Sequence, residues 1–215
     1  MEKKACIFDM DGTLVDSMGY WRTMQREYLS AWDAEGEKLA AVMEEARLLP
    51  LHLSTALFIR TFHIPQTPEE MTAEMTKRME VFYREKAELK PGAEEYLRTL
   101  KARDAKLCIA SATAKALVEC CMARLGVLDC FDFIISCTDV GAGKDKPDIF
   151  LEAARRLGCA PEETVVFEDS LQAVETAKRA GFGAVGVYDA SNASVWEQLA
   201  PLADEAILDW WTATV

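Results

Sequence analysis

The feature that most constrains the fold is a regular alternation of short apolar runs with helical segments. From the second apolar run onward, a segment of helical periodicity lies between each run and the next. These helical segments begin at Pro or Ser and end at Gly, as in 147–158 and 170–181. This alternation requires crossover connections, so the sequence predicts a mostly parallel sheet with helices on both faces. The expected fold class is α/β, with a three-layer, Rossmann-like core. The runs with the length and composition of buried strands are 5–8, 106–110, 133–136, 164–167, 184–187 and 205–208.

The stretch from about residue 18 to residue 86 interrupts this alternation of strand-like and helical segments. Its apolar residues recur at three-to-four spacing in four successive segments, which is typical of amphipathic helices. Thr67-Pro68-Glu69-Glu70 is a good helix start with an acidic first turn. We therefore predict an all-helical domain at 17–87, inserted after the first strand of a core formed by 1–16 and 88–215.

The composition excludes several classes of protein. The 215 residues carry a net charge of −12, which argues against a surface that binds nucleic acid. No apolar run approaches the length of a membrane span, and the first residues do not resemble a signal peptide, so we expect a cytoplasmic protein with no membrane partner. The seven cysteines include no CxxC pair and are interpreted as reduced thiols. The oligomeric state stays open, and a monomer is compatible with the sequence.

Side chains suited to chemistry follow four of the predicted strands. In an open parallel sheet, ligands bind beyond the carboxyl ends of the strands, so these side chains are expected to converge on one edge. Two acids, a hydroxyl, a lysine and two more acids would meet there, a set that suits phosphoryl transfer. They are Asp9 and Asp11 after the first strand, Ser111 after the second, Lys144 beyond the third, and Glu168 and Asp169 after the fourth.

Each of these groups can serve a specific role in phosphoryl transfer. The carboxylates of Asp9 and Asp169 can hold Mg²⁺, which also relieves the repulsion between neighbouring acids. A carboxylate can act as a nucleophile and form an aspartyl-phosphate. Ser111 and nearby backbone N–H groups can bind phosphoryl oxygens, and Lys144 can supply positive charge. Lys146 is a rival for the last position, although its spacing to Pro147 favours Lys144.

Four short motifs carry a family resemblance. "FDMDGTLVDS", "SAT", "GKDKPD" and "EDS" occur in this order, each behind a predicted strand, and resemble the four motifs of the haloacid dehalogenase-like hydrolase superfamily. The helical insertion lies where the subfamily with a cap after the first strand has its cap. Within that subfamily, the chain is similar to the branch of β-phosphoglucomutase and phosphoglycolate phosphatase. The resemblance covers essentially the whole chain.

The resemblance implies a role for each motif. Asp9 would be the nucleophile and a metal ligand, while Asp11 would be the general acid and base whose backbone carbonyl also touches the metal. Asp169 would be a direct Mg²⁺ ligand, with Glu168 a ligand or its neighbour. The phosphate-binding residues would be Ser111, Ala112 and Lys144.

The resemblance also implies an enzyme: a Mg²⁺-dependent phosphatase of small phosphorylated metabolites that works through Asp9. Thr13, after the second aspartate and glycine, favours a phosphatase over a dehalogenase. Sugar-phosphate relatives often have a histidine five residues after the Asp16 position, where this chain has Trp21, which disfavours a mutase. The alternatives are a phosphomutase on the same fold and a catalytically silent binding protein. Candidate substrate contacts in the helical insertion are Trp21, Arg22, Arg47 and Arg60.

Overall fold

The structure, a computed structural model, describes residues 4–32, 34–46, 49 and 51–214. The chain forms two compact units. One comprises Met1–Ser17 with Ala87–Val215, and the other comprises Met18–Lys86. We call the first the core unit and the second the helical unit.

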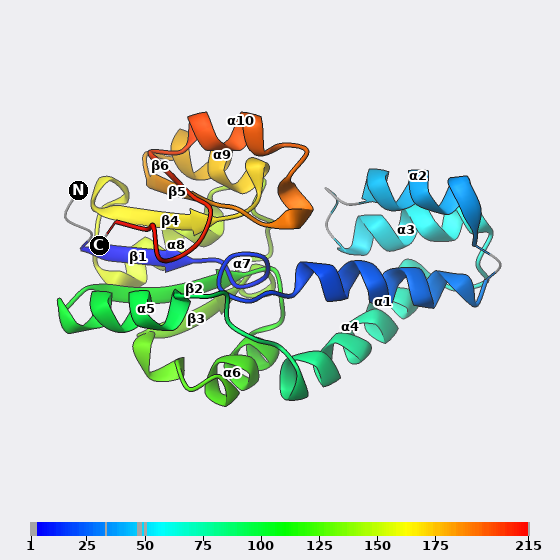
Figure 1. Ribbon diagram of the computed structural model, residues 1–215, viewed down its shortest axis with the longest axis horizontal. Coiled ribbons are helices and arrows are strands. Elements are labelled where there is room, and N and C mark those ends of the chain that lie inside the picture. The colour runs from blue at the N-terminus through cyan, green and yellow to red at the C-terminus, as the bar shows by residue number, and fades with distance from the viewer. Residues whose placement is uncertain (1–3, 33, 47–48, 50, 215) are drawn as a thin grey trace. The chain divides into compact units, whose positions relative to one another are not determined.

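The core unit contains a six-stranded sheet in which every pair of neighbouring strands is parallel (Figure 1). The strand order is β3-β2-β1-β4-β5-β6. Each predicted strand is present with its ends shifted by at most one residue, which confirms the α/β fold class. The strands are β1 Ala5–Phe8, β2 Lys106–Ser111, β3 Phe133–Ser136, β4 Thr164–Glu168, β5 Gly183–Val187 and β6 Glu205–Ile207.

Helices cover both faces of this sheet. They are α5 Ala93–Ala102, α6 Lys115–Arg124, α7 Cys137–Val140, α8 Asp148–Leu157, α9 Leu171–Arg179 and α10 Trp196–Leu202. Because side chains alternate along a strand, Ile7 belongs to the apolar cluster formed with α8 and α9. Phe8 points to the opposite face, where it stacks on Phe167 with 4.5 Å between ring centroids. This three-layer arrangement leaves every residue of β1 buried.

The C-terminal tryptophans differ from each other. Trp210 is buried against Phe8 and Tyr96 of α5, and its indole N–H donates to the backbone oxygen of Thr13 at 3.1 Å. Trp211 is 64% exposed. The tryptophan pair therefore contributes one side chain to the core and leaves the other at the surface.

The strand order places a topological switch point between β1 and β4. The chain runs from β1 outward through β2 and β3, and then returns to β4 on the other side of β1. Phe8 is in register with Phe167, and the N–H of Asp9 donates to the Phe167 carbonyl at 3.0 Å. The residues that follow β1 and β4 therefore lie side by side, at the place where open α/β sheets bind ligands.

The described residues of the helical unit form four helices: α1 Met18–Ser30, α2 Gly36–Ala46, α3 Leu51–Phe62 and α4 Pro68–Glu85. The helix α4 begins as expected, with Thr67 and Glu70 forming a reciprocal capping box. Its residues Met71, Met75 and Met79 are fully buried at four-residue spacing. The methionine stripe is thus one side of a core, as its periodicity predicts.

Candidate active site

Three carboxylates gather at the switch point. Asp9 follows β1, Glu168 ends β4 and Asp169 comes next, and one oxygen from each lies within 4.8 Å of the others. All three side chains are buried. A buried set of hard oxygen donors at this separation fits a divalent cation such as Mg²⁺, which prefers carboxylate ligands.

Lys144 lies among these carboxylates, in the loop between α7 and α8. Its Nζ donates to Asp9 Oδ1 and, at 2.6 Å, to Glu168 Oε1. The other oxygen of Glu168 accepts from the Ser170 N–H at 3.2 Å. The Lys144 side chain is only 13% exposed, whereas Lys146 is exposed. Lys144 is therefore the lysine that the structure brings to the acids.

The ionisation of these groups reflects burial and mutual charge. The pKa of Glu168 is raised to about 7: burial is the largest cause, Lys144 opposes the rise, and the charge of Asp9 adds to it. Burial, followed by the charges of Asp9, Glu168 and Asp189, raises the pKa of Asp169 well above its usual range. Burial alone would lower the pKa of Lys144, but the charges of Asp9 and Glu168 outweigh it and the pKa is raised. Lys144 therefore stays charged, but its single positive charge does not compensate the negative charges of the buried carboxylates around it.

Asp11 is held apart from this acid cluster by two hydroxyl groups. Its Oδ1 accepts from Ser17 Oγ and its Oδ2 from Thr113 Oγ1, each at 2.7 Å. The carboxylate is partly exposed and has a fixed orientation. Ser111, rather than Ser17 or Thr113, is the hydroxyl residue that the sequence predicts for this site. The available signal was that Ser17 lies in the same motif as Asp11, "FDMDGTLVDS", and that Thr113 ends the motif "SAT".

Ser111 is the last residue of β2 and is buried, while Ala112 is exposed. The Ser111 hydroxyl accepts from the Thr113 N–H at 3.0 Å, which fixes the turn before α6. Ser111 pairs in register with Ser136 of β3, so it lies at the same edge of the sheet as the residues after β1. The turn thereby sets both Ser111 and the Thr113 hydroxyl that binds Asp11.

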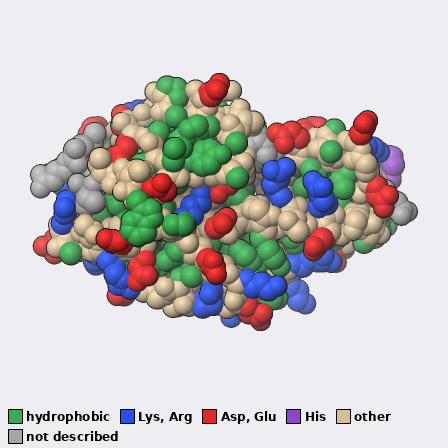
Figure 2. Space-filling view, viewed as in Figure 1, with side chains coloured by type: hydrophobic (Ala, Val, Ile, Leu, Met, Phe, Trp, Pro, Cys, Tyr) green, Lys and Arg blue, Asp and Glu red, His purple; other side chains and the backbone are tan. Residues whose placement is uncertain are grey.

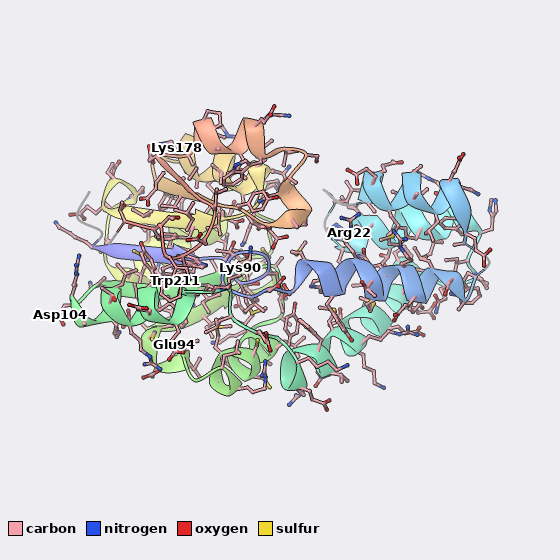
Figure 3. The ribbon with its side chains drawn as sticks, in the orientation of Figure 1. Arg22, Lys90, Glu94, Asp104, Lys178 and Trp211 are labelled. Atoms are coloured by element: carbon pink, nitrogen blue, oxygen red, sulfur yellow. The ribbon has the colours of Figure 1, made fainter. Side chains whose placement is uncertain are left out.

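The predicted substrate contacts of the helical unit have different surroundings. Trp21 is partly buried, and its indole N–H donates to Tyr83 Oη at 3.1 Å within the same unit. Arg22 extends from α1 (Figure 3) and is exposed, as is Arg60 on α3. Arg47 lies outside the described residues.

Charged side chains of both signs are interspersed on the face of each unit seen in Figure 2. No helix among the described residues is both long enough and apolar enough to cross a membrane.

The fold and the acid cluster define an α/β enzyme-like core with three buried carboxylates at its switch point. The sequence profile of the haloacid dehalogenase-like hydrolase family matches residues 3–181. The chain belongs to this family.

Individual relatives agree with this assignment. The chain is 34% identical to the putative phosphatase YhcW of Bacillus subtilis (strain 168), over 85% of this chain and 82% of the relative. It is 31% identical to the bifunctional riboflavin kinase/FMN phosphatase of Arabidopsis thaliana over 84% of this chain, but it spans only 47% of that longer protein. Among solved structures, CbbY from Rhodobacter sphaeroides in complex with phosphate superposes with a TM-score of 0.81 and 25% identity, covering 97% and 95% of the two chains.

Proposed function

We propose that the protein is a Mg²⁺-dependent phosphatase of small phosphorylated metabolites that works through an aspartyl-phosphate on Asp9. The observation that carries the proposal is the grouping of Asp9, Glu168 and Asp169 around Lys144, with Asp11 held separately by Ser17 and Thr113. This arrangement separates a metal-binding nucleophile from an acid–base group. Membership of the hydrolase family and the phosphatase names of its relatives support the same reaction class.

The donor set supports a hard divalent cation. Asp9 and Asp169 would be direct ligands, the backbone carbonyl of Asp11 a further one, and Glu168 a ligand or its neighbour. When bound, Mg²⁺ would supply positive charge that offsets the carboxylates and the substrate phosphate. The separation of the oxygen atoms and their burial are what this role needs.

In the first step, a carboxylate oxygen of Asp9 attacks the phosphorus and the bond to the leaving oxygen breaks. Asp11 donates a proton to that leaving oxygen as the alcohol departs. The hydroxyls of Ser17 and Thr113 orient the Asp11 carboxyl for this transfer. Lys144, with Ser111 and the backbone at Ala112, binds the phosphoryl oxygens and offsets the charge that develops on them.

In the second step, Asp11 takes a proton from a water molecule, whose oxygen attacks the phosphorus of the aspartyl-phosphate. The bond between phosphorus and the Asp9 oxygen breaks, and inorganic phosphate leaves with the Asp9 carboxylate restored. A mutase would instead return the phosphoryl group to a hydroxyl of the substrate.

The helical unit, Met18–Lys86, would act as the cap that selects the substrate. The sequence predicts a cap at 17–87, and these boundaries remain a prediction. Arg22 and Arg60 are exposed cations suited to an anionic substrate, and Arg47 is a third candidate from the sequence. The Trp21 indole N–H is engaged by Tyr83, so we assign Trp21 an apolar contact rather than a polar one.

The test is phosphate release from a panel of sugar phosphates, phosphoglycolate, nucleotides and a chromogenic phosphate ester, with Mg²⁺ or with chelator. We expect Mg²⁺-dependent release that is lost in Asp9→Asn. We also expect Lys144→Met to lose about 10²–10³-fold in kcat, the range typical of an electrostatic catalytic group. Lys146→Met, an exposed lysine in the same loop, is the matched control and should keep wild-type activity.

Substantial turnover by Asp9→Asn would refute the mechanism. Equal losses in the two lysine variants would show that the loop, rather than the Lys144 charge, matters. Sugar-bisphosphate-dependent isomerisation without phosphate release would identify a mutase, and silence in every assay would favour a binding protein.

A further inference from the structure

A second polar network, formed by Lys90 with the buried residues Asp189 and Asn192, is connected to the backbone of the acid cluster. Asn192 is the only asparagine in the sequence, and it is 5% exposed. Asp189 caps, and Asn192 ends, a short 3₁₀ turn, Ala190–Asn192, that follows β5. Both residues lie beyond the matched stretch of the family, which ends at residue 181.

The Asn192 side chain connects the loops that follow β4 and β5. Its Nδ2 donates to the backbone oxygen of Asp169 at 2.9 Å and to that of Val187 at 3.0 Å. Its Oδ1 accepts from the Asp189 N–H at 3.2 Å. Asp169 comes directly after the last residue of β4, so the Asn192 amide fixes its backbone just beyond the sheet.

Asp189, whose backbone N–H contacts this asparagine, is itself held by Lys90. Lys90 Nζ pairs with Asp189 Oδ2 and donates to the Tyr188 carbonyl, each at 2.8 Å. The backbone N–H of Lys90 donates to the Leu14 carbonyl at 2.8 Å. Lys90 lies just before α5, close to the loop that follows β1 (Figure 3). The network therefore joins the loops after β1, β4 and β5, and two of these loops carry the acid cluster.

We propose that Asn192, held by the Lys90–Asp189 ion pair, is a positioning residue that fixes the Asp169 carboxylate for metal binding. This inference rests on the metal site of the proposed function. Outer groups that orient metal ligands commonly change metal affinity by about 10–100-fold when removed. A purely structural hydrogen bond would instead change stability and leave the affinity of the folded protein unchanged.

The test is calorimetric titration of the substrate-free protein with Mg²⁺, together with a thermal melt in chelator. Asn192→Ala should weaken Mg²⁺ binding by about 10–100-fold. The matched control is Thr164→Val, at the other end of β4, which removes the 2.9 Å hydrogen bond that the buried Thr164 hydroxyl donates to the Ala160 carbonyl. It should lower the melting temperature but leave Mg²⁺ affinity unchanged.

A second variant covers the case in which Asn192→Ala does not fold. Lys90→Met with Asp189→Asn removes the ion pair without changing the net charge, and it should weaken Mg²⁺ binding by about tenfold. Wild-type affinity in every folded variant of this network would overturn the inference and leave the phosphatase proposal standing. A wild-type protein that binds no Mg²⁺ would overturn both.

Discussion

Replacement of Glu168 by glutamine gives a stability change whose dependence on pH can be derived from the structure. The pKa of Glu168 is raised from 4.5 to about 7, with burial as the leading cause. A raised pKa means that the folded protein binds the proton more tightly than the unfolded chain does. The carboxylate therefore costs no stability below about pH 4.5, where both states are protonated, and destabilises the fold as the pH rises towards about 7.

The size of the effect follows from the shift. A difference of about 2.5 pKa units corresponds to about 3 kcal/mol of stability that the wild type loses over the full titration. About 2 kcal/mol of this falls between about pH 5.5 and pH 8, a range that avoids precipitation near the isoelectric point of 4.7. Glutamine has no proton to lose, so Glu168→Gln should become more stable than wild type by about this amount across that range.

The assay is urea unfolding of both proteins in chelator at several pH values, which compares their free energies of unfolding. Glu163→Gln is the matched control: Glu163 precedes β4, is exposed and pairs with Lys4 at 2.9 Å, and its pKa is lowered by that partner. It should show no gain relative to wild type as the pH rises. A constant difference between Glu168→Gln and wild type would refute the assignment of a raised pKa. A relative loss with rising pH would show that the ion pair with Lys144 outweighs burial.

Two further changes test the acid–base group and the sheet. Thr113→Val removes one of the two hydroxyl groups that donate to Asp11, so it should lower kcat by about tenfold or more. Binding of inorganic phosphate should be retained. An unchanged kcat would show that Thr113 has no part in the mechanism. Gly186→Ala places a Cβ in steric conflict with Leu199 Cδ2, which belongs to a buried cluster. Urea unfolding should show a free energy of unfolding lower by about 1–3 kcal/mol. Wild-type stability would mean that the Leu199 side chain repacks without cost.

The sequence predicts the fold well because its signals are local. Short apolar runs locate every strand to within one residue, and Pro, Ser and Gly mark the ends of helices between them, since both signals are supplied by adjacent residues. The four-residue spacing of Met71, Met75 and Met79 likewise reports a buried helix face.

The site residues that follow the strands are predictable because parallel strands bring their carboxyl ends to one edge of the sheet. Strand order then places Asp9 beside Glu168 and Asp169, although 159 positions separate Asp9 from Glu168 in sequence (168 − 9). The supporting contacts are not predictable in this way. Ser17, Thr113 and Asn192 act through side-chain hydrogen bonds to particular atoms, and no periodicity or capping rule specifies such partners.

The same charges suggest an order of binding. Three carboxylates and one ammonium give the cluster of Asp9, Glu168, Asp169 and Lys144 a charge of −2 when all are ionised (−3 + 1). A phosphate dianion would be repelled by this cluster, whereas one divalent cation brings the charge to zero and leaves Lys144 able to turn towards the phosphate. Asp11, whose oxygens accept from Ser17 and Thr113, is not a member of this cluster and is not included in its charge. For the proposed phosphatase, we therefore expect the metal to bind first and the phosphorylated substrate second.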